Sequence, residues 1–156
     1  THVAVLDRGR VVAQGDPRGI FASAAALGVL EALGAENLFE SKVVARSSGV
    51  LSLETARGCR LEMASVAGFP DPARVAVRAE DIMLAARPPE LVSAQNILAG
   101  DVVALEPLGD HVYVRIAGGG ESWVAKVTPR AVERLSIAPG RPVHLLIKAH
   151  AIHAYA

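Results

Sequence analysis

The strongest constraint on the fold of this chain is a segment that it contains twice. GAENLFESKVVAR begins at Gly34, and SAQNILAGDVVAL begins 59 positions later, at Ser93. In this register five residues are identical: Ala35, Asn37, Val43, Val44 and Ala45 align with Ala94, Asn96, Val102, Val103 and Ala104. Each copy also closes with a basic residue and an alanine, Arg78-Ala79 and Lys148-Ala149, which lie 70 positions apart.

A chance match is the alternative, because the chain is rich in alanine and valine. The shared order of turns and the shared closing pair argue against chance. The repeat therefore predicts two similar units that pack on each other around a common core.

Each unit is expected to be a small β-barrel. From Ala35 onward, short apolar runs are separated by turns rich in glycine and proline, which is typical of barrels built from short strands. The second copy is longer, and its added residues include TPRAVERL, where Thr128 and Pro129 predict the N-cap and first position of a helix. The expected strands contain residues 43–45, 50–53, 61–63, 75–77, 102–105, 112–116, 123–127 and 143–147.

The first 34 residues follow another pattern. Two apolar runs, 3–6 and 11–14, flank Asp7-Arg8-Gly9-Arg10, which predicts a β-hairpin with Gly9 in its turn. Asp16-Pro17 is typical of a helix start, apolar residues follow at helical spacing, and Gly34 is a typical helix stop. A hairpin and one helix bury too little surface to fold alone, so we expect them to belong to a larger domain.

Composition excludes several classes of protein. A hydrophobic fraction of 51% with 21% charged residues indicates a folded chain. Sixteen basic residues balance sixteen acidic ones and only 4% of residues are aromatic, so neither a nucleic acid nor an anionic membrane is an expected partner. No uninterrupted apolar run is long enough to span a bilayer, and no signal peptide is evident. A single cysteine, Cys59, excludes an internal disulfide and fits a reducing cytosol.

The second copy resembles a known family. SAQNILAGDVVAL through VAKVTPRAVERLSIAPGRPVHLLIKAHAI is similar to the molybdenum-binding-protein (Mop) or TOBE module. The pattern of that module is S-A-R-N, a valine-rich strand, a T-x-x-A helix, L-x-L-x-x-G and a closing L-I-K-A. VAVLDRGRVVAQGDPRGIF and VRAEDIMLA extend the resemblance to the C-terminal part of the ATP-binding subunit of a molybdate ABC importer. It covers nearly the whole chain.

The resemblance implies a mostly β fold of two tandem OB-like small β-barrels (TOBE/Mop-like), preceded by a β-hairpin plus an α-helix. It divides the chain into three parts. Residues 1–34 would be the C-terminal remnant of an ABC nucleotide-binding domain, residues 35–92 the first TOBE/Mop-like barrel half, and residues 93–156 the second Mop-like barrel half.

The resemblance also implies a role in regulation and assembly. Two such regions would form a homodimer through their barrels, peripheral to the cytoplasmic face of the cell membrane, and the parent protein would bind the membrane permease subunits. The chain contains no G-x-x-x-x-G-K-[ST] motif, ABC signature or strand-borne acidic pair for magnesium, so we do not expect it to hydrolyse ATP. Two alternatives stay open: a free-standing cytoplasmic molybdate storage protein, and the accessory domain of another solute importer's ATPase.

The ligand that the resemblance implies is an oxyanion, molybdate or tungstate, and no other cofactor is expected. Such a tetrahedral dianion needs several N–H or O–H donors and a positive charge. The family supplies these groups from S-A-R-N and L-I-K-A. The corresponding residues here are Ser93, Gln95, Asn96, Lys148 and Ala149.

Gln95 stands where the family pattern has arginine, so it brings a hydrogen-bond donor without a charge. The alternative to a binding site is structural: Ser93 and Asn96 cap the strand entry, and Lys148 lays its stem along the barrel with its head in water. Arg78 holds the position of Lys148 in the first copy and is a candidate for a second anion site.

Four other groups invite a chemical role, and each has a simpler explanation. We expect His144 and His150 on one face of a strand and His153 on the other, which does not form a metal site. The adjacent Glu80 and Asp81 are expected to face opposite ways on a strand at the barrel rim. AGGGES lies between two strands and predicts a hairpin turn rather than a phosphate loop. Two arginines beside Cys59 could lower its pKa, although a lone thiol is usually inert.

Overall fold

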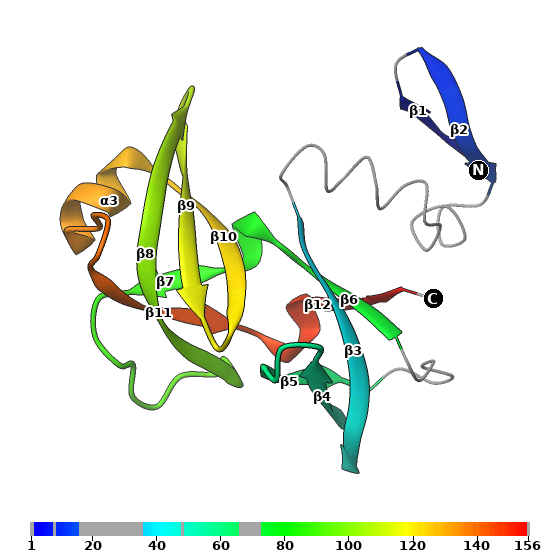
Figure 1. Ribbon diagram of the computed structural model, residues 1–156, viewed down its shortest axis with the longest axis horizontal. Helices are drawn as coiled ribbons and strands as arrows, with labels where there is room; N and C mark the ends of the chain where they lie inside the picture. The colour runs from blue at the N-terminus through cyan, green and yellow to red at the C-terminus, as the bar shows by residue number, and fades with distance from the viewer. Residues whose placement is uncertain (1, 8, 16–35, 48, 66–72, 156) are drawn as a thin grey trace.

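The computed structural model describes residues 2–7, 9–15, 36–47, 49–65 and 73–155. Most of these residues lie in β-strands (Figure 1). The first copy of the repeat contains β3 (Glu36–Ser47), β4 (Val50–Thr55), β5 (Arg60–Ala64), β6 (Ala73–Arg78), the 3₁₀ turn η1 (Ala79–Asp81) and β7 (Met83–Ala85). The second copy contains β8 (Asn96–Leu108), β9 (His111–Gly118), β10 (Glu121–Val127), helix α3 (Pro129–Leu135), β11 (Pro142–Ile147), the 3₁₀ turn η2 (Ala149–Ala151) and β12 (Ile152–Tyr155).

Two five-stranded antiparallel sheets hold the two copies together, which confirms the mostly β architecture predicted from the repeat. The first sheet has the order β12-β6-β3-β4-β5, and the second has the order β10-β9-β8-β11-β7. The copies exchange strands, because β7 of the first copy pairs with β11 of the second, and β12 of the second pairs with β6 of the first. The exchange is symmetric: Met83 faces Leu146, and His153 faces Ala76, with each member shifted by 70 positions.

The repeated valine-valine-alanine triplets form two equivalent bulges. The pairing of β3 with β4 shifts between Val43 and Ala45, and that of β8 with β9 shifts between Val102 and Ala104. An extra residue on one strand bends it and increases its twist. The repeat therefore places the same bend in the longest strand of each sheet, and this bend lets both sheets curl around the core.

Within the described residues, one cluster of buried apolar side chains joins the two sheets. Both sheets supply fully buried members, among them Leu53 and Val77 from the first and Trp123 and Leu145 from the second. Burial of apolar surface is the main favourable contribution to folding. The described part of each copy therefore buries apolar side chains in a core that it shares with the other copy.

The local predictions can be compared with the described elements. Thr128 caps α3, where its Oγ1 accepts a hydrogen bond from Ala131 N at 3.2 Å, as predicted. The N-terminal hairpin is confirmed as β1 (Val3–Asp7) and β2 (Arg10–Gly15), with Gly9 at φ 77°. AGGGES is confirmed as the turn between β9 and β10. The helix predicted over residues 17–33 lies outside the described residues.

Two placements on strands were wrong. Glu80 and Asp81 lie in η1, so they do not alternate across a strand. Likewise β11 ends at Ile147 and His150 lies in η2, so His144 and His150 do not share one strand face. In both copies the chain must turn sharply after the closing basic residue to reach the other sheet, and a period-two pattern does not reveal this turn.

Candidate functional site

The two asparagines of the chain, Asn37 and Asn96, each connect one copy to the other. Asn96 begins β8, and its Nδ2 donates hydrogen bonds to Ile147 O in the same sheet at 3.1 Å and to Glu62 O on β5 at 2.9 Å. Its Oδ1 accepts a hydrogen bond from Glu62 N at 2.6 Å. We call this arrangement, together with η2, the Asn96 junction. The amide group thus binds the backbone of β5, the edge strand of the other sheet, as a neighbouring strand would.

Asn37 makes the equivalent contacts in the first copy. Its Nδ2 donates to Val77 O at 3.0 Å and to Val124 O on the edge strand β10 at 2.9 Å. Its Oδ1 accepts from Val124 N at 2.6 Å. We call this arrangement, together with η1, the Asn37 junction. The repeated asparagine therefore has a structural cause, since each one satisfies polar backbone groups that would otherwise be buried at a sheet edge.

The structure brings most of the predicted site residues to the Asn96 junction. Asn96, the first residue of β8, pairs with Ile147, the last residue of β11. Gln95 and Lys148 each lie one residue beyond this pair, so the chain segments that carry the two halves of the predicted site are neighbours. Ser93, Gln95 and Lys148 are exposed, whereas Ala149 is buried at the start of η2. Both amide hydrogens of Asn96 donate to the backbone, so this residue positions the strand.

Arg78 lies at the equivalent place in the Asn37 junction, where it meets other charges. Its Nη1 is 4.0 Å from Glu80 Oε1, and Lys126 Nζ is 3.9 Å from Glu80 Oε2. One carboxylate therefore lies between two cations that come from different copies of the repeat.

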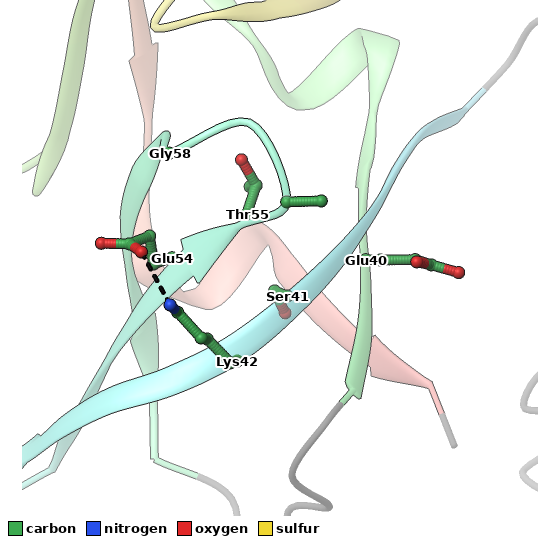
Figure 2. Close-up of a pocket in the computed structure, with 7 residues that line it drawn as sticks. Glu40, Ser41, Lys42, Glu54, Thr55 and Gly58 are labelled. Carbon is green, nitrogen blue, oxygen red and sulfur yellow. Dashed lines mark ion pairs between the residues drawn. The ribbon is translucent and has the colours of Figure 1, made fainter.

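The hollow drawn in Figure 2 has a volume of about 330 Å³ and lies along β3 and β4. Inside it Lys42 Nζ is 3.0 Å from Glu54 Oε1, and the hydrogen bond and charge of Lys42 lower the pKa of Glu54. The lysine charge is thus already balanced by a carboxylate, which makes this hollow a poor site for a dianion. The lining residues are Glu40, Ser41, Lys42, Glu54, Thr55, Ala56 and Gly58, none of them a predicted site residue.

A buried polar contact joins the tips of two hairpins, and the sequence did not indicate it. Thr55 Oγ1 donates a hydrogen bond to Glu121 Oε1 at 2.6 Å, and Arg57 Nε is 4.0 Å from Glu121 Oε2. Glu121 is only 8% exposed. Thr55 and Glu121 are 66 positions apart, so only the pairing of the two copies brings them together.

Cys59 lies beside this contact and is not activated. Its side chain is buried, and both this burial and the negative charge of Glu121 raise its thiol pKa. The idea that the neighbouring arginines lower the pKa of Cys59 is therefore wrong. The thiol is kept protonated at neutral pH.

The three histidines that were considered for a metal site lie on three different elements. His144 is on β11, His150 on η2 and His153 on β12, which belongs to the other sheet. Among the residues that the structure describes, no group of three or more histidine, cysteine, aspartate or glutamate side chains could hold a metal ion. None of the helices in the described part of the chain has the length and apolar run that crossing a bilayer requires.

Residues 92–154 match the TOBE domain family. Over 155 residues the chain is 34% identical to the molybdate/tungstate import ATP-binding protein WtpC of Pyrococcus abyssi, a match that covers 99% of this chain and 42% of the relative. It is 33% identical over 154 residues to the molybdenum import ATP-binding protein ModC of Rhizobium etli, covering 97% of this chain and 43% of the relative. The chain therefore spans about two fifths of the length of these curated relatives, and it matches their C-terminal, non-catalytic region.

One solved structure matches most of the fold. A crystal structure of the cytoplasmic molybdate-binding protein ModG with molybdate bound superposes with a TM-score of 0.67 at 25% sequence identity. The match covers 77% of this chain and 95% of that chain. The fold is thus similar to that of a protein that is described as binding molybdate.

Proposed function

We propose that this chain is the regulatory and dimerisation region of the ATP-binding subunit of a molybdate or tungstate importer. The premise is the match of residues 92–154 to the TOBE domain. The observation that carries the proposal is the agreement of two independent matches. The curated importer subunits match the chain over nearly its full length, and the fold resembles that of a molybdate-binding protein. In this role the domain would bind the oxyanion on the cytoplasmic side of the membrane and restrain its further import.

The oxyanion site in this proposal lies at the Asn96 junction. Ser93 and Gln95 would donate from the loop before β8, and Lys148 and the backbone N–H of Ala149 would donate from the start of η2. Lys148 would supply the positive charge that a dianion requires. Asn96 would act as a positioning residue, because its hydrogen bonds fix the loop and the turn against β5.

The site is tested by isothermal titration calorimetry of the purified chain with molybdate, tungstate and sulfate. We expect molybdate and tungstate to bind, and Lys148→Ala to weaken binding about tenfold or more, because one charge-assisted hydrogen bond is lost. If the wild-type chain binds neither molybdate nor tungstate, the proposed sensor role is wrong, and only the proposed role in assembly remains.

We further propose that two chains associate through their barrels and that the parent subunit contacts membrane permease subunits. Exposed sheet edges provide the physical reason for association, and the edges formed by β7 and β12 are candidates for it. Sedimentation velocity over a range of concentrations measures the oligomeric state. A sedimentation coefficient that stays at the monomer value over this range would contradict the dimer.

A free-standing molybdate storage protein is the second candidate, and the similarity to ModG favours it. The match to the importer subunit WtpC, however, covers 99% of this chain, whereas the match to ModG covers 77%. Calorimetry separates the two functions, because tight uptake of several molybdate ions per oligomer indicates storage, whereas weak or single-site uptake indicates a sensor.

A further inference from the structure

We propose that His150 is a ligand of the oxyanion at the Asn96 junction, and that Glu80 is an internal counter-ion that closes the Asn37 junction to anions. The inference rests on the proposed function, since it concerns the same oxyanion. It explains why two junctions with the same backbone would differ in binding.

The two 3₁₀ turns are equivalent in backbone geometry. Arg78 before η1 has φ −68° and ψ 142°, and Lys148 before η2 has φ −70° and ψ 146°. The residues that follow the turns, Ile82 and Ile152, both have φ −92°, with ψ 112° and 121°. Glu80 and His150 are the second residues of these turns and therefore occupy equivalent positions.

In the Asn37 junction this second position is occupied by a carboxylate that two cations share. Glu80 lies 4.0 Å from Arg78 and 3.9 Å from Lys126, measured between the closest charged atoms. A dianion that entered here would have to displace Glu80 from both cations and would also be repelled by it. The contacts further show that a side chain at this position reaches both the residue before the turn and the edge strand opposite.

In the Asn96 junction the same position is occupied by a donor. Within the ranges that the structure describes, no ion pair joins Lys148 or His150 to a carboxylate. A histidine ring donates one N–H when neutral and two when protonated. His150 would therefore add a donor beside Lys148 where the other junction has an acceptor.

The edge strands differ in the same sense. Asn37 binds the backbone of Val124, and Lys126 follows two residues later on β10. Asn96 binds the backbone of Glu62, and the residue two positions later on β5 is Ala64. A methyl group thus stands where the first junction has a long charged side chain, so the side chain at this position cannot take the place of a ligand beside His150. The donor of His150 would also offset the missing arginine at Gln95.

The experiment is calorimetric titration of the full chain with sodium molybdate at fixed pH. We expect His150→Glu to weaken binding about tenfold or more, because it installs the carboxylate that the Asn37 junction carries. His153→Glu is the matched control, since it makes the same change at an exposed histidine in the other sheet, and it should leave the affinity unchanged. We expect the double variant Glu80→Gln, Glu36→Gln to raise the number of molybdate ions bound per chain from one to two, because Glu36 holds the position of Gln95 in the first copy and a carboxylate at either position would repel the dianion. Circular dichroism melting curves verify that each variant is folded.

The outcomes separate this inference from the proposed function. If His150→Glu binds within twofold of wild type while Lys148→Ala loses binding, the site exists without His150 and the inference is overturned. A single bound ion in the double variant Glu80→Gln, Glu36→Gln overturns the role of Glu80 as a counter-ion. If the folded wild-type chain binds no molybdate, the proposed sensor function fails, and the inference fails with it.

Discussion

The Asn37 and Asn96 junctions have the same hydrogen bonds and different surroundings. Beside Asn37, Phe39 packs on Trp123 with ring centroids 4.6 Å apart at an angle of 56°, and Trp123 Nε1 donates to Gly118 O at 3.0 Å. The equivalent positions near Asn96 hold two leucines, Leu98 and Leu61. The charges differ as well, since Glu80 is replaced by His150. The comparison teaches that backbone register and the amide contacts define the repeat, whereas apolar volume and charge have diverged around them.

The largest effect is expected where the two junctions differ in buried volume. Trp123→Ala should lower the free energy of unfolding by about 4 kcal/mol, because it opens a large cavity and removes the indole N–H that donates to Gly118 O. Leu61→Ala, at the equivalent position, should cost about 3 kcal/mol. Urea unfolding followed by far-ultraviolet circular dichroism measures both values. A larger loss for Leu61→Ala would show that the aromatic contact is not the more important one.

Removing the asparagines tests the feature that the junctions share. Asn37→Ala and Asn96→Ala should each lower the free energy of unfolding by about 2–3 kcal/mol, because each leaves buried backbone groups unsatisfied. Gln95→Ala, next to Asn96 and exposed, should change it by less than about 0.5 kcal/mol. The same urea titrations measure these changes. Clearly unequal losses for the two asparagines would contradict the equivalence of the junctions.

Substitutions of two glycines test whether the hairpin tips of the two copies are in close contact. Gly120 has φ 83°, and a Cβ there would lie 2.9 Å from Arg57 O, whereas Gly58 has φ 86° with nothing within 4 Å. Both alanine variants suffer the strain of a left-handed conformation, about 1–2 kcal/mol. Gly120→Ala should cost about 1 kcal/mol more, because a backbone atom must move. Equal melting temperatures of the two variants would mean that the tips are not in close contact.

The smallest effect is expected in the pH dependence of the free energy of unfolding, to which Cys59 contributes. Burial and the charge of Glu121 raise its pKa above the unfolded value, so the protonated thiol favours the folded state. This stabilisation is fully present below the unfolded pKa of about 8.5 and is lost as the pH rises through the folded pKa. The free energy of unfolding should therefore decline above about pH 8.5, and Cys59→Ala should remove that part of the decline. An unchanged profile in Cys59→Ala would exclude the thiol as its source.

The sequence predicted features that depend on neighbouring residues. The strands follow from period-two alternation, and the cap at Thr128 and the turn at Gly9 follow from the preferences of single residues. The repeat also predicted two equivalent units. These signals are local or periodic, so they can be interpreted without knowing which strands pair.

The features that the sequence did not reveal depend on contacts between the copies. Nothing in the three residues of β7 indicates that they join the second sheet. Burial of Glu121 depends on Thr55, far away in the chain. The hydrogen bonds of the Asn96 amide with β5 of the other copy could not be predicted either, because they depend on how the two sheets pack. The sequence predicted which residues belong to the candidate site. It did not predict that His150 and Glu80 occupy equivalent positions, which follows from the symmetry of the fold.

The exchange of β7 and β12 has a consequence for the order in which the protein can fold during translation. The sheet of the first copy is completed by residues 152–155, which leave the ribosome after all its other strands. Until then β6 presents an open edge to chaperones and to neighbouring nascent chains. The sheet of the first copy is therefore closed only after the whole second copy has been translated.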